Sequence, residues 1–266
     1  MIDPSHIFSL ANKNVLVTGA TGYLGSEMVI ALAKAGAHVL INSRSELKGE
    51  EFSKRVNEAG YSSEAAIFDV RNLTEVEAYF QTIASRPLHG LVNNAYAGGS
   101  GNIKNVGSHD YHASFDICVS AAHNMLKSSL SNMRLAVEHC GDASVINIAS
   151  MYGMVSPDPR IYDSEKGVNP PFYGAAKAAL IQWSRYSACE FGCENIRVNS
   201  ISAGPFPSPM VQSKEVDFIN RLSLKVPLGR IGQGAEIGGP VVFLASSAAS
   251  FVTGANLVVD GGWTSW

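Results

Sequence analysis

The sequence predicts an α/β fold in which helices cover both faces of one parallel β-sheet. Short apolar segments rich in β-branched residues alternate with longer segments of helical periodicity along the whole chain. The apolar segments are nearly uniform, as expected for strands that are buried on both faces. This alternation is typical of a doubly wound, three-layer arrangement. Seven strands are expected, at 14–18, 37–43, 65–70, 90–95, 144–150, 196–202 and 256–260.

Helical segments are expected between these strands, and glycine marks the ends of two of them. The first helix runs to Ala35 and is followed by Gly36, and a polar second helix ends at Gly60. Glycine is common just after a helix because it adopts the left-handed conformation without strain. The other helices are expected at about 74–85, 109–139 and 173–191, and after Gln233.

A single domain is expected over residues 1–266, because no linker, repeat or shift in composition divides the chain. Two segments break the alternation of strands and helices. One is the polar segment 154–171, and the other is 205–228, which begins rich in proline. Long connections in a compact domain are usually functional or mobile. We therefore expect both segments to border a binding site.

Composition limits the possible classes of function. The 20 basic and 23 acidic side chains give a formal net charge of −3 and form no block, so a nucleic-acid partner is not expected. The longest apolar runs, such as 240–245, are too short to span a membrane, and the first residues are unlike a signal peptide. The four cysteines lack metal-ligand spacing, so we expect no metal site and reduced thiols in a cytoplasmic protein.

The segment TGATGYLG at 18–25 follows the first strand and opens the first helix. A dinucleotide pyrophosphate must approach backbone N–H groups at a helix N-terminus, where a side chain would block it. Gly19 would allow a tight turn, Gly22 the close approach, and Gly25 a contact between helix and strand. A glycine-rich turn without a cofactor is the alternative. The predicted cofactor-binding residues of this turn are Gly19, Gly22, Tyr23, Leu24 and Gly25.

The end of the second strand favours NADP(H) over NAD(H). An acidic residue there would bind the ribose 2′-hydroxyl and repel a 2′-phosphate, whereas an arginine would attract the phosphate. No Asp or Glu occurs between Gly36 and Ser45, and Arg44 follows Ser43 at the strand end. NAD(H) stays possible if Arg44 is only a solvated loop residue. After the third strand, Asp69 and Val70 are further candidates, with Asp69 either accepting from the adenine amino group or capping the next turn.

The segment YGAAK at 173–177 places Tyr173 and Lys177 on the same face of a predicted helix. An ammonium close to a phenol favours the phenolate and lowers the phenol pKa, which suits the tyrosine to acid/base catalysis near neutral pH. Ser150 ends the fifth strand, and ligands of open α/β sheets bind beyond the carboxyl ends of the strands. Without Ser150, two unrelated helix residues would be the better interpretation of this common spacing.

Taken together, these motifs resemble the short-chain dehydrogenase/reductase family, in its single-domain branch. The resemblance also rests on NNA at 93–95 and on the C-terminal segment 227–263, and it covers nearly the whole chain. Among the members of that branch, 3-oxoacyl reductases and gluconate 5-dehydrogenases are similar. The resemblance implies a Rossmann-type seven-stranded fold, a nicotinamide cofactor and a homotetramer or homodimer.

The resemblance also implies roles for individual residues. Tyr173 would be the general acid/base, Ser150 would bind the substrate oxygen, and Lys177 would bind the nicotinamide ribose and lower the Tyr173 pKa. Asn93 and Ala95 would flank the cofactor. Gly204 would shape the nicotinamide pocket.

Several positions depart from the pattern of the family. Tyr23 occupies the middle-glycine position of the turn, which is closer to the extended members of the family, and Tyr96 follows NNA where glycine is usual. Cys118 falls where the family has an asparagine that holds a water in a proton relay. A thiol is poorly suited to that task, so Ser120 or a backbone carbonyl would have to take it over.

The expected reaction interconverts a carbonyl and a secondary alcohol on a polar small molecule. The interval between Ser150 and Tyr173 is longer than is usual in the family, and the polar groups of 154–171 favour a sugar, sugar acid or related keto compound. They could instead only solvate a loop. Tyr96 and Tyr152 are candidate substrate contacts beside Ser150, and 205–228 resembles the substrate lid of the family. A 3-oxoacyl thioester or small-ketone reductase, a non-catalytic nucleotide sensor, and an epimerase or dehydratase are the alternatives.

Overall fold

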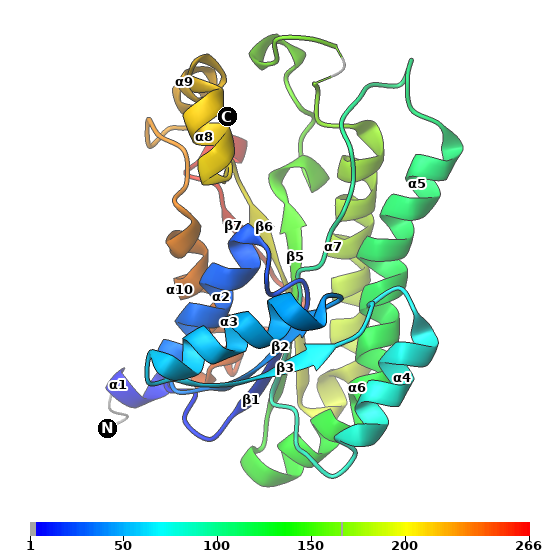
Figure 1. The fold of residues 1–266 in the computed structure, drawn as a ribbon, viewed down its shortest axis with the longest axis vertical. Helices are drawn as coiled ribbons and strands as arrows, with labels where there is room; N and C mark the ends of the chain where they lie inside the picture. Colours follow the sequence, from blue (N-terminus) through cyan, green and yellow to red (C-terminus); the bar gives the residue numbers. More distant parts are fainter. Residues whose placement is uncertain (1–3, 166) are drawn as a thin grey trace.

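Within residues 4–165 and 167–266, which the computed structural model describes, seven parallel strands form one sheet (Figure 1). The strand order is β3-β2-β1-β4-β5-β6-β7, so the chain builds outward from β1 and then returns past it to add β4. Such a reversal opens a crevice at the carboxyl ends of the two central strands. The strands are β1 (Asn14–Val17), β2 (His38–Ser43), β3 (Ser62–Ile67), β4 (Gly90–Asn93), β5 (Ala143–Ser150), β6 (Ile196–Ala203) and β7 (Asn256–Val259).

Alternate residues of the strands enter two separate cores, one on each face of the sheet. In β1, Val15 and Val17 pack on one side, whereas Leu16 packs on the other. This division explains why a strand such as β1 carries apolar residues at consecutive positions. The first core contains residues of α2 (Tyr23–Lys34), α3 (Glu46–Glu58) and α10 (Gly238–Ala245). The opposite face is covered by α4 (Leu73–Thr82), α6 (Ala121–Cys140) and α7 (Pro171–Phe191), with α5 (Ser108–Phe115) against α7.

The predicted single domain and doubly wound sheet are confirmed, but some boundaries differ. The third strand was expected at 65–70 and instead spans Ser62–Ile67. The side chain of Asn42 in β2 donates hydrogen bonds to the carbonyl oxygens of Ala66 and Phe68. Phe68 in turn donates its N–H to the carbonyl oxygen of Ser43, so the chain just beyond β3 stays attached to β2.

The helix expected at 109–139 is interrupted by a π-helical turn, η1 (Asp116–Ser120), between α5 and α6. A π turn accommodates one more residue than an α turn and is frequent at functional sites. Here it buries both Ile117 and Cys118 against Ala176 of α7. The sequence pattern gave no sign of it, because the apolar spacing continues through the turn.

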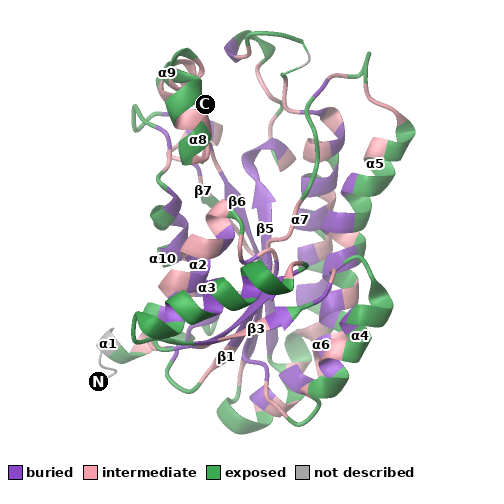
Figure 2. Cartoon of the chain, viewed as in Figure 1, coloured by how far each residue is buried: buried purple, intermediate pink, exposed green. Residues whose placement is uncertain are grey.

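The two irregular segments contain short helices and are exposed or half-buried over most of their length, in contrast to the buried central strands β5 and β6 (Figure 2). The 3₁₀ turn η2 (Met151–Gly153) follows β5, and η3 (Pro159–Ile161) lies within 154–171. Segment 205–228 carries α8 (Pro209–Lys214) and α9 (Val216–Lys225). The remaining short helices are α1 (Pro4–Ile7), η4 (Gly192–Glu194), η5 (Gly234–Ile237), η6 (Ser247–Ala249) and η7 (Trp263–Ser265).

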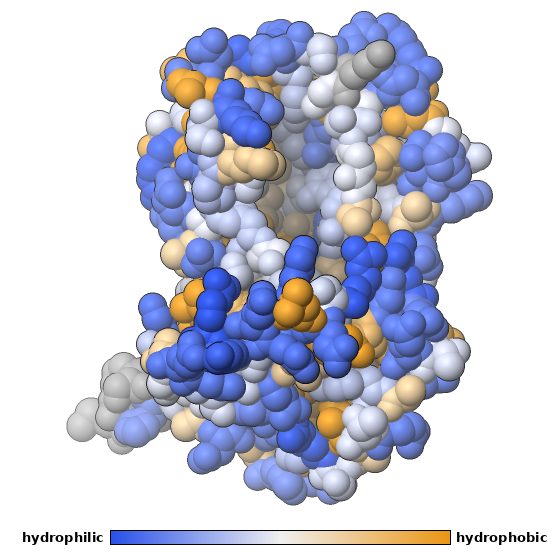
Figure 3. All heavy atoms as spheres, viewed as in Figure 1, coloured by the Kyte–Doolittle hydropathy of each residue, from blue (hydrophilic) through white to orange (hydrophobic). Residues whose placement is uncertain are grey.

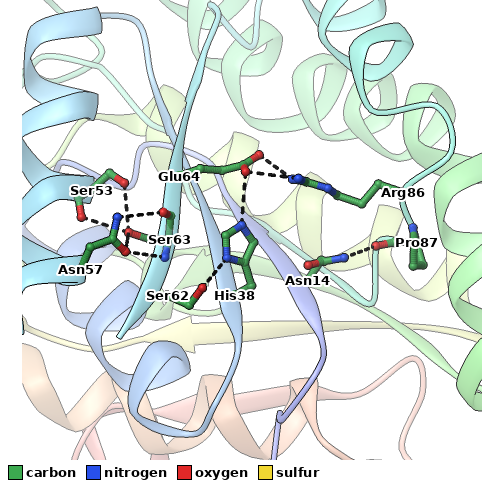
Figure 4. A network of polar contacts seen from close by, with 9 residues as sticks. All are labelled: Asn14, His38, Ser53, Asn57, Ser62, Ser63, Glu64, Arg86 and Pro87. Carbon is green, nitrogen blue, oxygen red and sulfur yellow. Dashed lines mark hydrogen bonds and ion pairs between the residues drawn. The ribbon is translucent and has the colours of Figure 1, made fainter. Parts of the chain in front are cut away.

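A polar network fastens the outer strands β2 and β3 (Figure 4). Glu64 of β3 is paired with Arg86, and its second partner is His38 of β2. Burial opposes ionisation of Glu64, but Arg86 and His38 together outweigh it and hold the pKa of this carboxyl below its usual value. The network thus stabilises the edge of the sheet whose carboxyl end leads to Asp69. No helix within the described residues is long and apolar enough to cross a membrane.

Candidate active site

A cleft of about 420 Å³ lies at the carboxyl ends of β1, β2 and β4, where the strand order reverses. Backbone turns after these strands and the first turn of α2 form its walls. This is the crevice in which open α/β sheets bind ligands. The sequence-predicted residues that line it are Gly19, Gly22, Tyr23, Leu24, Gly25, Ser43, Arg44, Asp69, Val70, Ala95 and Tyr96.

The glycine turn requires its glycines for reasons of space and conformation. Gly19 has a φ of +60°, and a Cβ there would lie 2.9 Å from the Cα of Ala95. A Cβ on Gly25 would lie 2.3 Å from the carbonyl oxygen of Gly19. Gly22 is the N-cap of α2 and has no side chain to occupy the free N–H groups of the first turn. The turn is therefore an anion cradle of the kind that binds pyrophosphate.

Short polar side chains join the turns around the cleft. Thr18 Oγ1 accepts hydrogen bonds from the backbone N–H groups of Asn94 and Ala95, at 2.9 and 3.1 Å. Asn94 Nδ2 donates in return to the carbonyl oxygens of Thr18 and Gly19. Asn42 Oδ1 accepts from the N–H of Gly19. These three side chains were not singled out from the sequence, because their partners lie on other strands.

The far end of the cleft carries several cationic side chains. Arg44 and Arg71 flank Asp69, with Arg71 Nη2 at 2.8 Å and Arg44 Nη1 at 3.8 Å from its carboxylate. The hydrogen bond from Arg71 lowers the pKa of Asp69. Asp69 also accepts from the N–H of Arg71, as a turn-capping residue does. Arg71 and Lys48 line the cleft and were not predicted.

Ser150 lies on β5, and Tyr173 and Lys177 lie on α7, which packs against β5 and contacts the cleft residue Tyr96. Ser150 ends β5, is 5% exposed, and accepts a hydrogen bond from the N–H of Tyr152. The turn η2 and the start of α7 approach closely at two glycines, since a Cβ on Gly174 would lie 2.6 Å from the carbonyl oxygen of Tyr152. Lys177 Nζ donates to the carbonyl oxygen of Ile148 at 2.7 Å and lies 5.7 Å from the ring centroid of Tyr173.

Asn93 and Gly204 do not line this cleft. Asn93 lies one layer below it and donates to Asn147, which donates to Ser184 of α7. A Cβ on Gly204 would lie 2.4 Å from the Cα of Asp260, so this glycine allows close packing after β6. The resemblance implied that Asn93 flanks the cofactor and that Gly204 shapes the nicotinamide pocket, and the polar chain from Asn93 to α7 was not foreseen.

A small cavity of about 10 Å³ lies between Asn93, Cys118 and Lys177. That volume is close to one water-sized probe. Burial raises the pKa of Cys118, and the ammonium of Lys177 opposes this effect only in part. The buried thiol therefore stays protonated at neutral pH. The other cysteines, Cys140, Cys189 and Cys193, are exposed and unpaired.

The tyrosines at the two unusual positions point in different directions. Tyr23 accepts a hydrogen bond through its hydroxyl from the N–H of Gly234 at 3.0 Å, so it ties the glycine turn to η5. Tyr96 packs against Tyr173 with ring centroids 5.0 Å apart. Burial raises the pKa of Tyr96 to about 12, and its phenol is therefore neutral.

Segments 154–171 and 205–228 contact each other across the top of the molecule. Arg221 of α9 donates to the carbonyl oxygen of Ile161 at 2.8 Å and also pairs with Asp163. Lys225 pairs with Asp158, whose pKa is lowered by hydrogen bonds from Arg160 and Lys225. Figure 3 shows a hollow beside α8 and α9, bounded on its other side by the chain that follows β4.

Aromatic rings continue this contact toward Tyr173. Tyr162 packs on Phe218 with ring centroids 5.5 Å apart, and its hydroxyl lies 3.1 Å from that of Tyr152. Burial raises the pKa of both Tyr152 and Tyr162. Tyr152 thus lies close to Ser150 in the chain and presents a neutral hydroxyl. Within the described part of the chain, no group of three or more His, Cys, Asp or Glu side chains is placed to bind a metal ion.

Comparison with known proteins shows similarity over nearly the whole chain. A family model described as Enoyl-(Acyl carrier protein) reductase matches residues 19–264. A tropinone reductase homologue of Arabidopsis thaliana is 32% identical over 263 residues, which are 96% of this chain and 91% of that protein. Trans-4-hydroxycyclohexanecarboxylate dehydrogenase of Sinomonas cyclohexanicum is 29% identical over 263 residues, 96% of this chain and 94% of that protein.

A solved structure is similar over the full length. It is a gluconate 5-dehydrogenase from Burkholderia cenocepacia in complex with NADP and tartrate, with a TM-score of 0.88 and 27% identity. The match covers 99% of this chain and 100% of that one. The matched residues include the glycine turn, the cleft, and both segments that border the hollow.

Proposed function

The chain belongs to the short-chain dehydrogenase/reductase family, and from this premise we propose that it is an oxidoreductase that interconverts a secondary alcohol and a carbonyl group. The observation that carries the proposal is the placement of Ser150, Tyr173 and Lys177 beside a cleft whose glycine turn leaves helix N–H groups free. A general acid/base, a hydroxyl to orient the substrate oxygen and a cofactor cradle are the parts that hydride transfer requires.

The residues of the cleft fit a nicotinamide dinucleotide, and we propose that NADP(H) is preferred over NAD(H). A Cβ on Gly19 or Gly25 would lie within 3 Å of Ala95 or Gly19, so both glycines permit the tight turn, and Gly22 leaves the N-terminus of α2 without a side-chain cap. At the other end, Arg44, Lys48 and Arg71 provide positive charge for a 2′-phosphate. The Burkholderia gluconate 5-dehydrogenase, which was crystallised with NADP, supports this choice. When bound, the cofactor supplies or accepts the hydride.

The protein's own side chains then transfer the proton to or from the substrate oxygen. In the direction of reduction, the phenol of Tyr173 donates its proton to the carbonyl oxygen as the carbon gains the hydride. In oxidation, the phenolate of Tyr173 removes the proton of the alcohol. The Ser150 hydroxyl orients the substrate oxygen, and the Lys177 ammonium favours the phenolate and binds the nicotinamide ribose. Tyr152 lies two residues after Ser150 in the chain, and its neutral hydroxyl is hydrogen-bonded to that of Tyr162.

We propose a polar hydroxylated substrate, such as a sugar acid or a hydroxy acid. The dehydrogenases of gluconate and of trans-4-hydroxycyclohexanecarboxylate support this class. The polar segment 154–171 and the helical segment 205–228, joined by Arg221, would cover such a substrate as a lid and exclude water. A 3-oxoacyl thioester is the second candidate, favoured by the acyl-carrier-protein description of the matching family model.

We further propose a cytoplasmic homo-oligomer, either a homotetramer or a homodimer. An exposed apolar groove along the edge strand β7 includes Val258 and Leu228, which are 40% and 67% exposed. A second copy of the chain would bury these side chains. The unpaired state of all four cysteines supports a reducing compartment.

The proposal is tested first by fluorescence titration with NADPH and NADH, and then by turnover. D-gluconate and trans-4-hydroxycyclohexanecarboxylate are offered with NADP⁺, and tropinone and acetoacetyl thioesters with NADPH. Tyr173→Phe should bind NADPH as tightly as the wild type and lose at least ~100-fold in turnover, because general acid/base catalysis is removed.

A matched control is Tyr111→Phe, which removes a hydroxyl from an exposed tyrosine on α5. It should keep full activity. Wild-type-like turnover in Tyr173→Phe would refute the assigned role. Binding of NADPH with no turnover on the whole panel would favour a nucleotide sensor, and product without a change in cofactor absorbance would indicate epimerisation or dehydration.

A further inference from the structure

Tyr96 takes part in an aromatic and cationic cluster with Tyr173 and Lys177. Its ring meets the ring of Tyr173 edge to face, at 5.0 Å between centroids and 72° between planes. The Nζ atom of Lys177 lies over the ring of Tyr96 at 5.2 Å from its centroid. Both distances are in the range in which aromatic pairs and cation–π pairs attract.

The surroundings of Lys177 make this contact significant. Lys177 is 4% exposed, and its ammonium donates to the carbonyl oxygen of Ile148 at 2.7 Å. Its other hydrogen-bond partner is the thiol of Cys118 on η1, which is a weak acceptor. A buried ammonium with so few acceptors is costly unless other groups stabilise it. The electron-rich faces of Tyr96 and Tyr173 are the groups that the structure places around it.

Tyr96 is itself held in place at its hydroxyl end. Its hydroxyl lies 3.5 Å from the Ser114 hydroxyl, which donates to the carbonyl oxygen of Phe172 at the start of α7. A Cβ on Gly98 would lie 2.3 Å from the Tyr96 hydroxyl oxygen, so the chain after β4 folds closely over the ring. The ring therefore has a defined position relative to α7, the helix that carries both Tyr173 and Lys177.

We propose that Tyr96 is a positioning residue, whose ring holds the Lys177 ammonium beside Tyr173 in a chain that has a thiol at position 118. This inference rests on the proposed oxidoreductase function and adds a residue to it. It predicts that the electrostatic character of the Tyr96 ring, rather than its hydroxyl or its volume, sets how readily Tyr173 loses its proton.

The other groups that face Tyr173 and Lys177 do not explain the same effect. Cys118 on η1 is a neutral thiol, and Tyr152 on η2 has its pKa raised by burial and is neutral as well. Ser150 at the end of β5 carries no charge. Among the described residues of this cluster, Lys177 is thus the one charged group. Two rings face its ammonium, that of Tyr173 and that of Tyr96.

The test follows the titration of the Tyr173 phenol by NMR, in protein that carries ¹³C at the tyrosine Cζ positions. Tyr173→Phe assigns the resonance. Tyr96→Met, which has no aromatic face, should raise the midpoint of the Tyr173 titration by roughly 0.5–1 pH unit, the size of a partly buried cation–π contact. Tyr96→Phe, which keeps the ring, should move it by less than ~0.3 pH unit on the same grounds.

A further substitution separates the electrostatic effect of the Tyr96 ring from the effect of lost packing. Tyr96→pentafluorophenylalanine keeps the shape of the ring and removes the negative charge of its face, so it should shift the midpoint as Tyr96→Met does. Tyr111→Met is the matched control. Tyr111 of α5 packs on Phe172 of α7, and among the described residues its ring makes no cation–π contact with Lys177. It should leave the midpoint unchanged.

The outcomes separate this inference from the proposed function. The titration needs neither substrate nor cofactor, so it reports on Tyr96 even if no compound is turned over. A shift in the fluorinated variant with none in Tyr96→Phe supports the positioning role. An unchanged midpoint in the fluorinated variant overturns it, and equal shifts in Tyr96→Phe and Tyr96→Met would assign the effect to the hydroxyl. If a substrate is found, the pH profile of oxidation should move by the same amount.

Discussion

The two halves of the active-site region are held in place by different means. On the cofactor side, backbone conformation and short side chains fix the cleft, through Gly19, Gly25 and the hydrogen bonds of Thr18 and Asn94. On the substrate side, long charged side chains reach between 154–171 and 205–228. The first kind of contact has almost no freedom to adjust, whereas the second can break and re-form with rotation of side chains.

This difference indicates that the cofactor site is preformed and that the substrate site is adjustable. A dinucleotide has one shape at its pyrophosphate, so a rigid cradle loses no ordering entropy when it binds. Substrate must enter and product must leave, which requires contacts that open. Substitutions on the cofactor side should therefore weaken the binding of NADPH strongly. Substitutions on the substrate side should change the KM for substrate by smaller factors.

The largest effect is expected at Gly25. In Gly25→Ala the Cβ would lie 2.3 Å from the Gly19 carbonyl oxygen, so the turn must shift and its N–H groups no longer meet the pyrophosphate. The loss of two charge-assisted hydrogen bonds, each worth about 1.5–3 kcal/mol, corresponds to at least ~100-fold weaker binding of NADPH in a fluorescence titration. Gly239→Ala is the control, because nothing lies within 4 Å of a Cβ there. Binding within a few-fold of the wild type in Gly25→Ala would mean that the cradle is not rigid.

An effect of intermediate size is expected from acid, through His89. This side chain is 7% exposed, and its Nδ1 accepts from the N–H of Asn14, which joins the amino ends of β1 and β4. Burial lowers the pKa of His89 to about 4, against 6.5 in an exposed histidine. Because the unfolded chain binds the proton more readily, stability should fall as the pH drops from about 6.5 to about 4, by about 2–3 kcal/mol.

Urea unfolding at pH 7 and pH 4.5 measures this loss. His89→Gln, which keeps an acceptor without titrating, should lose less stability between the two values. The ion pairs of the substrate side should persist over the same interval, since the pKa of Asp158 lies well below its usual value. Equal acid sensitivity in the wild type and His89→Gln would contradict the assignment to His89.

The smallest effect is expected at Arg221. Arg221→Met removes the hydrogen bond to the Ile161 carbonyl oxygen and the pair with Asp163. A charged hydrogen bond at a partly exposed site is worth about 1.5 kcal/mol, so the KM for substrate should rise by roughly 5- to 10-fold. Binding of NADPH should change by less than 2-fold on the same argument. Arg134→Met removes an ion pair with Glu194 on another part of the surface and should leave both constants unchanged. A large loss of NADPH affinity in Arg221→Met would show that the two halves are not independent.

The same contrast explains what the sequence could predict. The alternation of strands and helices, the glycine turn and the spacing of Tyr173 and Lys177 follow from periodicity and local pattern, whereas the roles of Ser150, Tyr173 and Lys177 came from the resemblance to the family. Contacts between residues distant in the sequence could not be inferred. Arg221 meets Ile161 across sixty positions of the chain, and Thr18 meets Asn94 only because β1 and β4 are neighbours.

The sequence pattern also failed to predict the π-helical turn, because the same spacing of apolar residues fits an α-helix and a π-helix. The spacing through 116–120 fits an α-helix, and the π turn there became visible only from its packing against α7. Asn42 lies inside the strand expected at 37–43 and Arg71 just after the strand expected at 65–70, and neither was predicted as a site residue. Their importance depends on the bend after β3, which their own hydrogen bonds help to form.

The strand order also governs when the site can come into existence as the chain is synthesised. Val15 of β1 takes Gly90 of β4 as its neighbour, and Thr18 has no N–H groups to accept from until Asn94 and Ala95 have left the ribosome. Closing a loop of that length costs conformational entropy before the contacts between β1 and β4 can stabilise the chain. A nascent chain that ends before β4 therefore carries the glycine turn, Arg44 and Asp69 and has no cleft in which to use them.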